Sequence, residues 1–210
     1  MKKGIVFIVG CTLGTAAAAW AGDIPKALDE GVLRLGPLLS GALERTGAEW
    51  WEERTTSGGG GGAYFWAQYD GSWFAYEARL GAVGVGGDGD WDIIIDWENE
   101  YCMYLIEGKY RPYVALGAGL RRAERRVGET TGIFGFYFGV RLNSPVSPFY
   151  MTFGGGYKYA EYSYGVIHNR YYFGLSTTVA FRVELEAGSE FTSGKGAFFG
   201  RLNAGPSFSF

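Results

Sequence analysis

Most of the chain alternates between apolar and polar positions with a period of two residues, which is the period of a β-strand. The longest such run is WDIIIDWENEYCMYL, residues 91–105, in which four of the seven even-numbered positions are acidic and most odd-numbered positions are apolar. At about 3.3 Å per residue, this run would extend about 50 Å, enough to cross a bilayer at a tilt. We predict one unbroken strand, because the alternation is continuous. A turn at residues 98–100 would instead divide the run into two short strands.

The same alternation predicts nine further strands, separated by glycine, proline and polar residues. The first of them is the least regular, because an amphipathic helix also fits residues 24–44. Gly36-Pro37 would break that helix, although Pro37 is also unfavourable in a strand. A strand is favoured because a barrel with both ends on one side needs an even number of strands. The nine predicted strands are residues 32–45, 63–70, 73–82, 112–121, 132–142 and 149–159, two within 171–191, and 198–210.

The predicted connections alternate in length along the chain. Short turns are expected at DGS, EGKY and NSPVSP, and mostly longer polar loops at residues 46–62, 83–90, 121–130, 161–169 and 192–196. The Gly58–Gly62 run is expected to be a flexible loop, and a turn is expected near Phe181–Val183, although no turn residue marks it. Short turns at one end of a cylinder and long loops at the other are typical of outer-membrane proteins.

These features predict an all-β fold: a closed, antiparallel, up-and-down transmembrane β-barrel of about ten strands. The alternative is a barrel of eight strands preceded by an N-terminal amphipathic helix.

The N-terminal residues have the three parts of a secretory signal peptide. A basic start, MKK, is followed by an apolar stretch and by the small-residue site AWA at residues 19–21. We expect residues 1–21 to be a signal peptide and residues 22–210 to form one barrel domain. An uncleaved membrane anchor and a lipid on Cys11 are the weaker alternatives. Cleavage would leave Cys102 without a disulfide partner.

Composition and charge narrow the class of protein further. The chain has 36 glycines in 210 residues, and 18% of its residues are aromatic. Glycine alone would suggest disorder, but disordered chains are poor in aromatic residues. Without the two lysines of the predicted signal peptide, 17 basic and 22 acidic residues remain, a net charge of −5. This balance disfavours nucleic acid as a partner.

Two segments resemble a known family. YRPYVALGAGL is similar to the strand that follows a periplasmic turn in small outer-membrane β-barrels of the OmpA-like class, and the C-terminal SFSF resembles the targeting signal of that class. The resemblance implies an outer-membrane location in a Gram-negative bacterium, contact with outer-membrane lipid, and recognition of Phe208 and Phe210 by the barrel assembly machinery. The class includes anchors, adhesins, narrow pores and a few lipid-modifying enzymes, so it specifies no activity. The soluble alternative is a secreted β-sandwich or lipocalin-like barrel.

If the apolar faces of the strands point toward lipid, the opposite faces bring charges of both signs into the lumen. A barrel of about ten strands has little room for water beyond its own side chains. We therefore expect a paired network that fills the lumen, with a narrow ion path as the alternative. The predicted network comprises Glu77, Arg79, Asp92, Asp96, Glu98, Glu100, Arg121, Arg141, Lys158, Arg182, Glu184, Glu186 and Arg201.

No recognisable catalytic, metal or cofactor motif accompanies these charges. His168, the only histidine, is expected near the outer rim, where a lipid-modifying enzyme would need it beside a nucleophile such as Ser163 or Ser176. Asp88 and Asp90 lack the spacing of a calcium loop. We therefore expect no catalytic residue, no metal and no cofactor.

Four tryptophans are expected at the membrane interface, where aromatic rings concentrate. They are Trp50, Trp51, Trp91 and Trp97. The expected function is a structural or surface-interaction role through extracellular loops, with an unidentified surface ligand or protein partner. A narrow pore is the alternative, and a lipid-modifying enzyme is the less favoured one.

Overall fold

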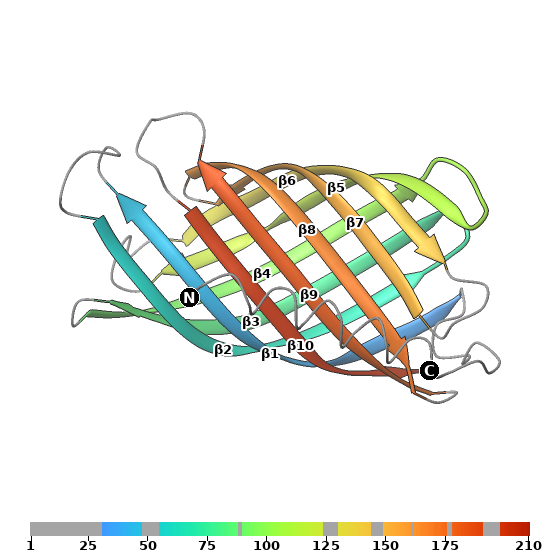
Figure 1. Ribbon diagram of the computed structural model, residues 1–210, viewed down its shortest axis with the longest axis horizontal. Helices are drawn as coiled ribbons and strands as arrows, with labels where there is room; N and C mark the ends of the chain where they lie inside the picture. The colour runs from blue at the N-terminus through green and yellow to red at the C-terminus, as the bar shows by residue number, and fades with distance from the viewer. Residues whose placement is uncertain are drawn as a thin grey trace, which may run out of the picture.

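The chain forms a closed barrel of antiparallel strands (Figure 1). The structure is a computed structural model that describes residues 31–47, 55–87, 90–123, 130–143, 149–160, 162–175, 178–190 and 198–210. Each strand pairs with its neighbours in sequence, and β1 pairs with β10 to close the barrel. The ten strands of the described residues are β1 Val32–Gly47, β2 Thr55–Asp70, β3 Phe74–Gly87, β4 Asp90–Tyr104, β5 Tyr110–Ala123, β6 Thr130–Asn143, β7 Phe149–Ala160, β8 Tyr162–Gly174, β9 Val179–Glu190 and β10 Phe198–Ser209.

This architecture confirms the predicted fold class and strand number. Residues 32–47 form β1, so the helical alternative is wrong for that segment. Residues 90–104 form the single strand β4, without a turn at residues 98–100. No helix long and apolar enough to cross a membrane occurs in the part of the chain that the structure describes. The predicted signal peptide, residues 1–21, lies outside the described residues.

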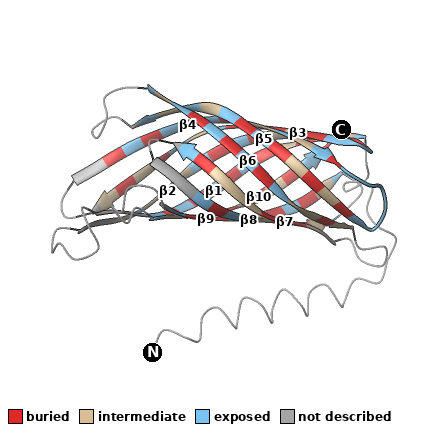
Figure 2. Cartoon of the chain, turned by 90° about the horizontal axis from the view of Figure 1, so that it is seen from above, coloured by how far each residue is buried: buried red, intermediate tan, exposed pale blue. Residues whose placement is uncertain are grey.

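Buried and exposed residues alternate along the strands (Figure 2), because successive side chains point to opposite faces of the barrel wall. On β4, Ile93, Ile95 and Trp97 are exposed, whereas Asp92 and Asp96 are buried in the lumen. Apolar residues outside and charged residues inside reverse the arrangement of a soluble barrel. The reversal suits lipid, where a spanning sheet must close to satisfy its backbone hydrogen bonds.

Several predicted connections are strand instead. The Gly58–Gly62 run lies within β2, and residues 162–169 lie within β8, which is separated from β7 by residue 161 alone. The predicted turn at Phe181–Val183 lies inside β9, and the chain turns between Gly174 and Val179. The two ends of the barrel therefore differ less in connection length than the sequence predicted, since β3 and β4 are separated only by residues 88–89.

Glycine is suited to β2 because the strands approach closely there. A Cβ atom added to Gly60 or Gly62 would overlap the backbone carbonyl oxygen of Gly84 or Ala82 on β3. Both glycines occupy even-numbered positions of β2, the parity that faces the lumen. A run that would be flexible in isolation is thus ordered by pairing with β1 and β3.

The closing seam between β1 and β10 has a local gap in its ladder. The two strands are paired on either side of it, but residues 36–38 are not paired with residues 205–207. In the register of the seam, Pro37 faces Pro206. Neither proline has an N–H group, so neither can donate a ladder hydrogen bond. The seam is therefore weakest where the two prolines meet.

Replacing Pro206 by valine is expected to strengthen this seam. The Phe210 N–H donates to the Leu33 carbonyl at 2.9 Å, so even-numbered residues of β10 bond toward β1. A valine at position 206 would donate to the Pro37 carbonyl, and we expect the free energy of unfolding to rise by about 0.5–1.5 kcal/mol. Urea unfolding of the refolded barrel measures this change. Ala204→Val is the control, because it enlarges an outward side chain on the same strand without adding a donor; an equal effect of both changes would contradict the interpretation.

Candidate functional site

Among the described residues, buried charged and polar side chains are concentrated in the lumen. Each of the thirteen predicted lumen charges occupies an inward-facing position. The network also includes four charges that the prediction missed: Arg34, Asp70, Arg111 and Arg170. Arg34 and Arg111 occupy inward-facing positions in the alternation of their strands, so the sequence pattern could have identified them as lumen charges. Arg170 was missed because the preceding residues were assigned to a loop, and Asp70 because it was assigned to a turn.

The network extends along the barrel between its two ends: the terminal end, at which β1 begins and β10 ends, and the far end, opposite the chain's C-terminal residue. On the far side of the middle of the lumen, Asp96 of β4 accepts hydrogen bonds from three strands. Arg121 of β5 donates through Nε at 2.8 Å, Arg201 of β10 donates at 2.6 Å, and the Tyr64 hydroxyl of β2 donates at 3.1 Å. The Asp96 side chain is fully buried. One carboxylate therefore joins β2, β5 and β10 across the lumen.

Two cations hold three carboxylates in the middle of the lumen. Arg79 of β3 lies 2.6 Å from Glu98, 2.6 Å from Glu184 and 3.1 Å from Glu186. Lys158 of β7 lies 3.1 Å from Glu98 and 2.8 Å from Glu186. Pairing and multiple hydrogen bonds are what allow charges to remain buried.

A second layer of arginines lies closer to the terminal end. Arg182 contacts Glu77 at 2.7 Å and also pairs with Glu184, and its guanidinium carbon lies 4.2 Å from the centre of the Trp66 ring. Arg170 makes two hydrogen bonds to Glu100, at 2.9 and 2.6 Å. The two-point contact fixes the orientation of the Arg170 guanidinium as well as its charge.

The terminal end of the lumen is closed by a cluster around Asp70. Arg141 pairs with Asp70, Arg34 lies 3.5 Å from it, and the Tyr104 hydroxyl donates to it at 3.0 Å. The Arg111 guanidinium lies 3.8 Å from the centre of the Tyr104 ring. Charged and aromatic side chains therefore occupy this end of the lumen.

Between these layers the lumen has little free space. Two cavities of about 20 Å³ each are present, one around Glu98, Glu100 and His168 and the other around Gln68, Cys102 and Tyr104. A cavity of this size holds about one water molecule. The described side chains thus occupy most of the space in these layers of the lumen.

His168 does not lie where the sequence predicted. It is a buried residue of β8 that faces the lumen, because the segment assigned to an outer loop is strand. Its Nε2 lies 2.6 Å from the Tyr113 hydroxyl, and the Tyr137 ring approaches it edge-on with centroids 5.1 Å apart. Gly154 leaves room for this contact, since an added Cβ would overlap the Tyr113 hydroxyl.

These neighbours give His168 the environment of a packed and hydrogen-bonded lumen residue. The side chains of Ser163 and Ser176, the candidate nucleophiles, lie outside the described set, as do those of Asp88 and Asp90. Within the described residues, no cluster of three or more histidine, cysteine or acidic side chains is arranged to hold a metal ion.

The predicted interface aromatics can be placed only in part. The side chains of Trp50, Trp51 and Trp91 lie outside the described set. Trp97 faces outward but lies near the middle of β4, opposite Leu80 and Leu120. Its role at the interface stays a prediction.

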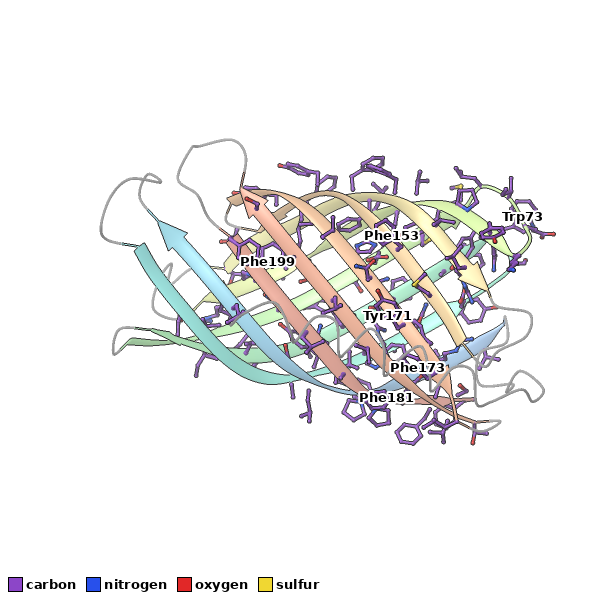
Figure 3. The ribbon with its side chains drawn as sticks, viewed as in Figure 1. Trp73, Phe153, Tyr171, Phe173, Phe181 and Phe199 are labelled. Atoms are coloured by element: carbon purple, nitrogen blue, oxygen red, sulfur yellow. The ribbon has the colours of Figure 1, made fainter. Side chains whose placement is uncertain are left out.

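The terminal end carries an aromatic group that the sequence analysis did not single out. Trp73, in the turn between β2 and β3, is exposed, and its position at this end is visible in Figure 3. Outward-facing Tyr69 and Phe74 flank the same turn, with ring centroids 5.6 Å apart. Phe181 lies on β9 at the same end of the barrel. Rings in these positions suit the border between hydrocarbon and headgroups.

The last residues extend this group on the closing strand. Phe208 and Phe210 point outward, whereas Ser209 is buried on the lumen face. The Ser209 N–H donates to the Thr178 carbonyl and the Phe210 N–H to the Leu33 carbonyl, at 2.8 and 2.9 Å. The chain is therefore hydrogen-bonded up to its final residue.

No protein-family model matches the chain, and no curated protein matches it in sequence. The solved structures that are similar to it include two barrels from Neisseria. Neisserial surface protein A is 12% identical with a TM-score of 0.44, over 86% of this chain and all of that one, and the translocator domain of autotransporter NalP from Neisseria meningitidis is 10% identical with a TM-score of 0.46, over 96% of each chain.

The classification of this chain accordingly follows from its own geometry. Its strands close into an up-and-down barrel, its outer face is mostly apolar, most of the described charges on its strands are enclosed, and aromatic residues border one end. These are the defining features of bacterial outer-membrane barrels. The chain has the fold of a small integral membrane β-barrel of the outer-membrane type.

Proposed function

We propose that this barrel is a non-enzymatic protein with a filled lumen that acts as a structural or surface-interaction component through the connections at its far end. The observation that carries the proposal is the series of ion-pair layers around Asp96, Arg79, Arg182 and Asp70, with cavities of about 20 Å³ among the described side chains. A solute path would need a continuous opening. The environment of His168, between two tyrosines, supports a packing role for the residue.

Reconstitution in a planar bilayer tests the filled lumen. We expect the refolded barrel to insert without producing steady unitary conductance in concentrated potassium chloride. An open general porin, reconstituted in the same way, is the control for the sensitivity of the recording. Steady unitary steps that scale with the amount of folded protein would contradict the proposal and favour the narrow pore.

The connections at the far end are the places for a surface contact. Three of them have six residues or more between strands: residues 48–54, 124–129 and 191–197. Replacing residues 48–54 with a glycine-serine connector should leave heat-modifiable migration unchanged, because the strands and their pairing are retained. Cells carrying this variant should then resemble cells without the protein in surface adhesion. If the protein has a structural role instead, loss of the whole barrel should raise uptake of a hydrophobic dye, whereas replacement of residues 48–54 should not. The proposed function would be refuted if neither surface adhesion nor dye uptake changed.

A further inference from the structure

The outer face of β4 carries a polar amide among apolar and aromatic residues. Asn99 is half-buried, and its odd-numbered position faces outward like that of Trp97. Along the strand, its nearest outward-facing neighbours are Trp97 and Tyr101, both exposed. Across the sheet, Asn99 pairs with Ala78 on β3 and with Ala118 on β5. The amide thus lies between two small side chains, on a surface that otherwise suits hydrocarbon.

Asn99 lies deep within the apolar face. It is five residues from Tyr104, the last residue of β4. At about 3.3 Å per residue and a strand tilt of about 40°, this separation is about 13 Å along the barrel axis, half of an apolar band about 25 Å tall. Exposed Met103 and Leu105 continue the apolar face toward the terminal end. The ester and headgroup oxygens of lipids are therefore too far away to accept a hydrogen bond from Asn99.

The chain satisfies this amide only in part. The Tyr76 hydroxyl donates to Asn99 Oδ1 at 2.6 Å, and within the described residues this is the one hydrogen bond of the Asn99 side chain. Its Nδ2 is not among the enclosed atoms that lack a partner, so a group outside the barrel can reach it. An asparagine amide has two N–H donors and two acceptor sites. Donor and acceptor capacity therefore remains open on the outer face, where hydrocarbon can pair with neither.

We infer that the outer face of β3, β4 and β5 docks a second copy of this chain, with the Asn99 amides of the two copies hydrogen-bonded to each other. A two-fold contact brings the same residue of both copies together. Each Nδ2 then donates to the other Oδ1, so one residue supplies both the donor and the acceptor that acyl chains lack. Ala78 and Ala118 keep the surface low beside the amide, and sheets that pack face to face lie about 10 Å apart, a separation that two asparagine side chains can bridge. The inference rests on the membrane location of the barrel and does not depend on its proposed function.

Sedimentation equilibrium in density-matched detergent micelles measures this association. Flotation with phosphatidylcholine vesicles first establishes that the refolded barrel enters a membrane. We expect a reversible equilibrium between monomer and dimer. Asn99→Leu keeps the size of the side chain and should weaken the dimer about tenfold, as expected for the loss of two hydrogen bonds between membrane-embedded side chains. Asn169→Leu is the matched control, because it makes the same change at an outward-facing position of β8, four strands away from β4.

A second variant tests the surface without removing the amide. Ala118→Phe raises the surface beside Asn99 and should also weaken the dimer, whereas Ala187→Phe, at an outward-facing position of β9, should not. Heat-modifiable migration shows that each variant is folded.

A barrel that stays monomeric at every concentration would overturn the inference, as would a dimer that Asn99→Leu and Asn169→Leu affect equally. A monomer that retains a lipid in native mass spectrometry and loses it on Asn99→Leu would also overturn it, since the occupant would then be a lipid. A barrel that does not float with the vesicles would instead refute the membrane location on which the inference rests.

Discussion

Replacing Asp96 by asparagine is expected to lower the free energy of unfolding of the barrel by about 3–5 kcal/mol, the range for removal of one partner from a buried ion pair. The change keeps the shape of the side chain but removes its charge. Arg121 and Arg201, which lie 2.8 and 2.6 Å from the carboxylate, would then face a neutral amide and each other. Two buried guanidinium groups without their shared counter-ion are unfavourable, because little water can reach them.

Urea unfolding in lipid vesicles, followed by tryptophan fluorescence, measures this effect. The matched control is Glu107→Gln, which makes the same chemical change at an exposed position in the turn between β4 and β5. We expect the control to stay within about 0.5 kcal/mol of the unmodified protein, as for most surface substitutions. Equal effects of the two substitutions would contradict the prediction that the buried ion pairs of Asp96 stabilise the barrel.

Deleting Phe210 is expected to reduce the amount of barrel in the outer membrane of cells to a small fraction of its normal level, with a much smaller effect on the stability of refolded protein. The deletion removes one ring and the hydrogen bond from the Phe210 N–H to Leu33. The ring is worth at most about 1.5–3 kcal/mol of burial, and its 77% exposure leaves it to contact lipid instead of protein. The rest of the ladder between β1 and β10 remains. The large effect is therefore expected from recognition during assembly, as the resemblance to outer-membrane barrels implies.

The experiment compares outer-membrane yield in cells with heat-modifiable migration after refolding in detergent. Phe208→Ala is expected to behave like the deletion, because Phe208 shares the outward face of β10. Ser209→Ala is the control, because Ser209 faces the lumen and lies between the two phenylalanines. Normal assembly of the Phe210 deletion in cells would show that the C-terminal residues are not a targeting signal.

The strands and their two faces were largely determined by the sequence itself. The parity of residues 91–105 is enough to place Trp97 outside and Asp96 inside, because successive side chains of a strand point to opposite faces. The charges of both signs on one face, together with apolar residues on the other, predict a barrel with a charged lumen. That inference required no knowledge of which strand pairs with which.

Segments without a clear alternation needed the tertiary structure. Residues 162–169 mix polar, aromatic and aliphatic residues without an evident period, yet they lie in β8, because they pair with β7 and, from Tyr164 onward, also with β9. The Gly58–Gly62 run has little strand preference of its own, but it lies between β1 and β3, where the close approach of the backbones favours glycine. In a closed sheet, the neighbouring strands keep a segment in the strand conformation. The sequence of the segment alone therefore predicts that conformation only in part.

The partners in the lumen were also decided by closure of the barrel. Arg79 meets Glu184 and Glu186 from more than one hundred positions away in the chain, and Arg182 likewise meets Glu77. Parity predicts that these side chains face inward, but it cannot tell which of them meet, because that depends on strand number, stagger and tilt together. The sequence by itself determined which side of the wall each residue faces; only the closed barrel decided which residues lie next to one another there.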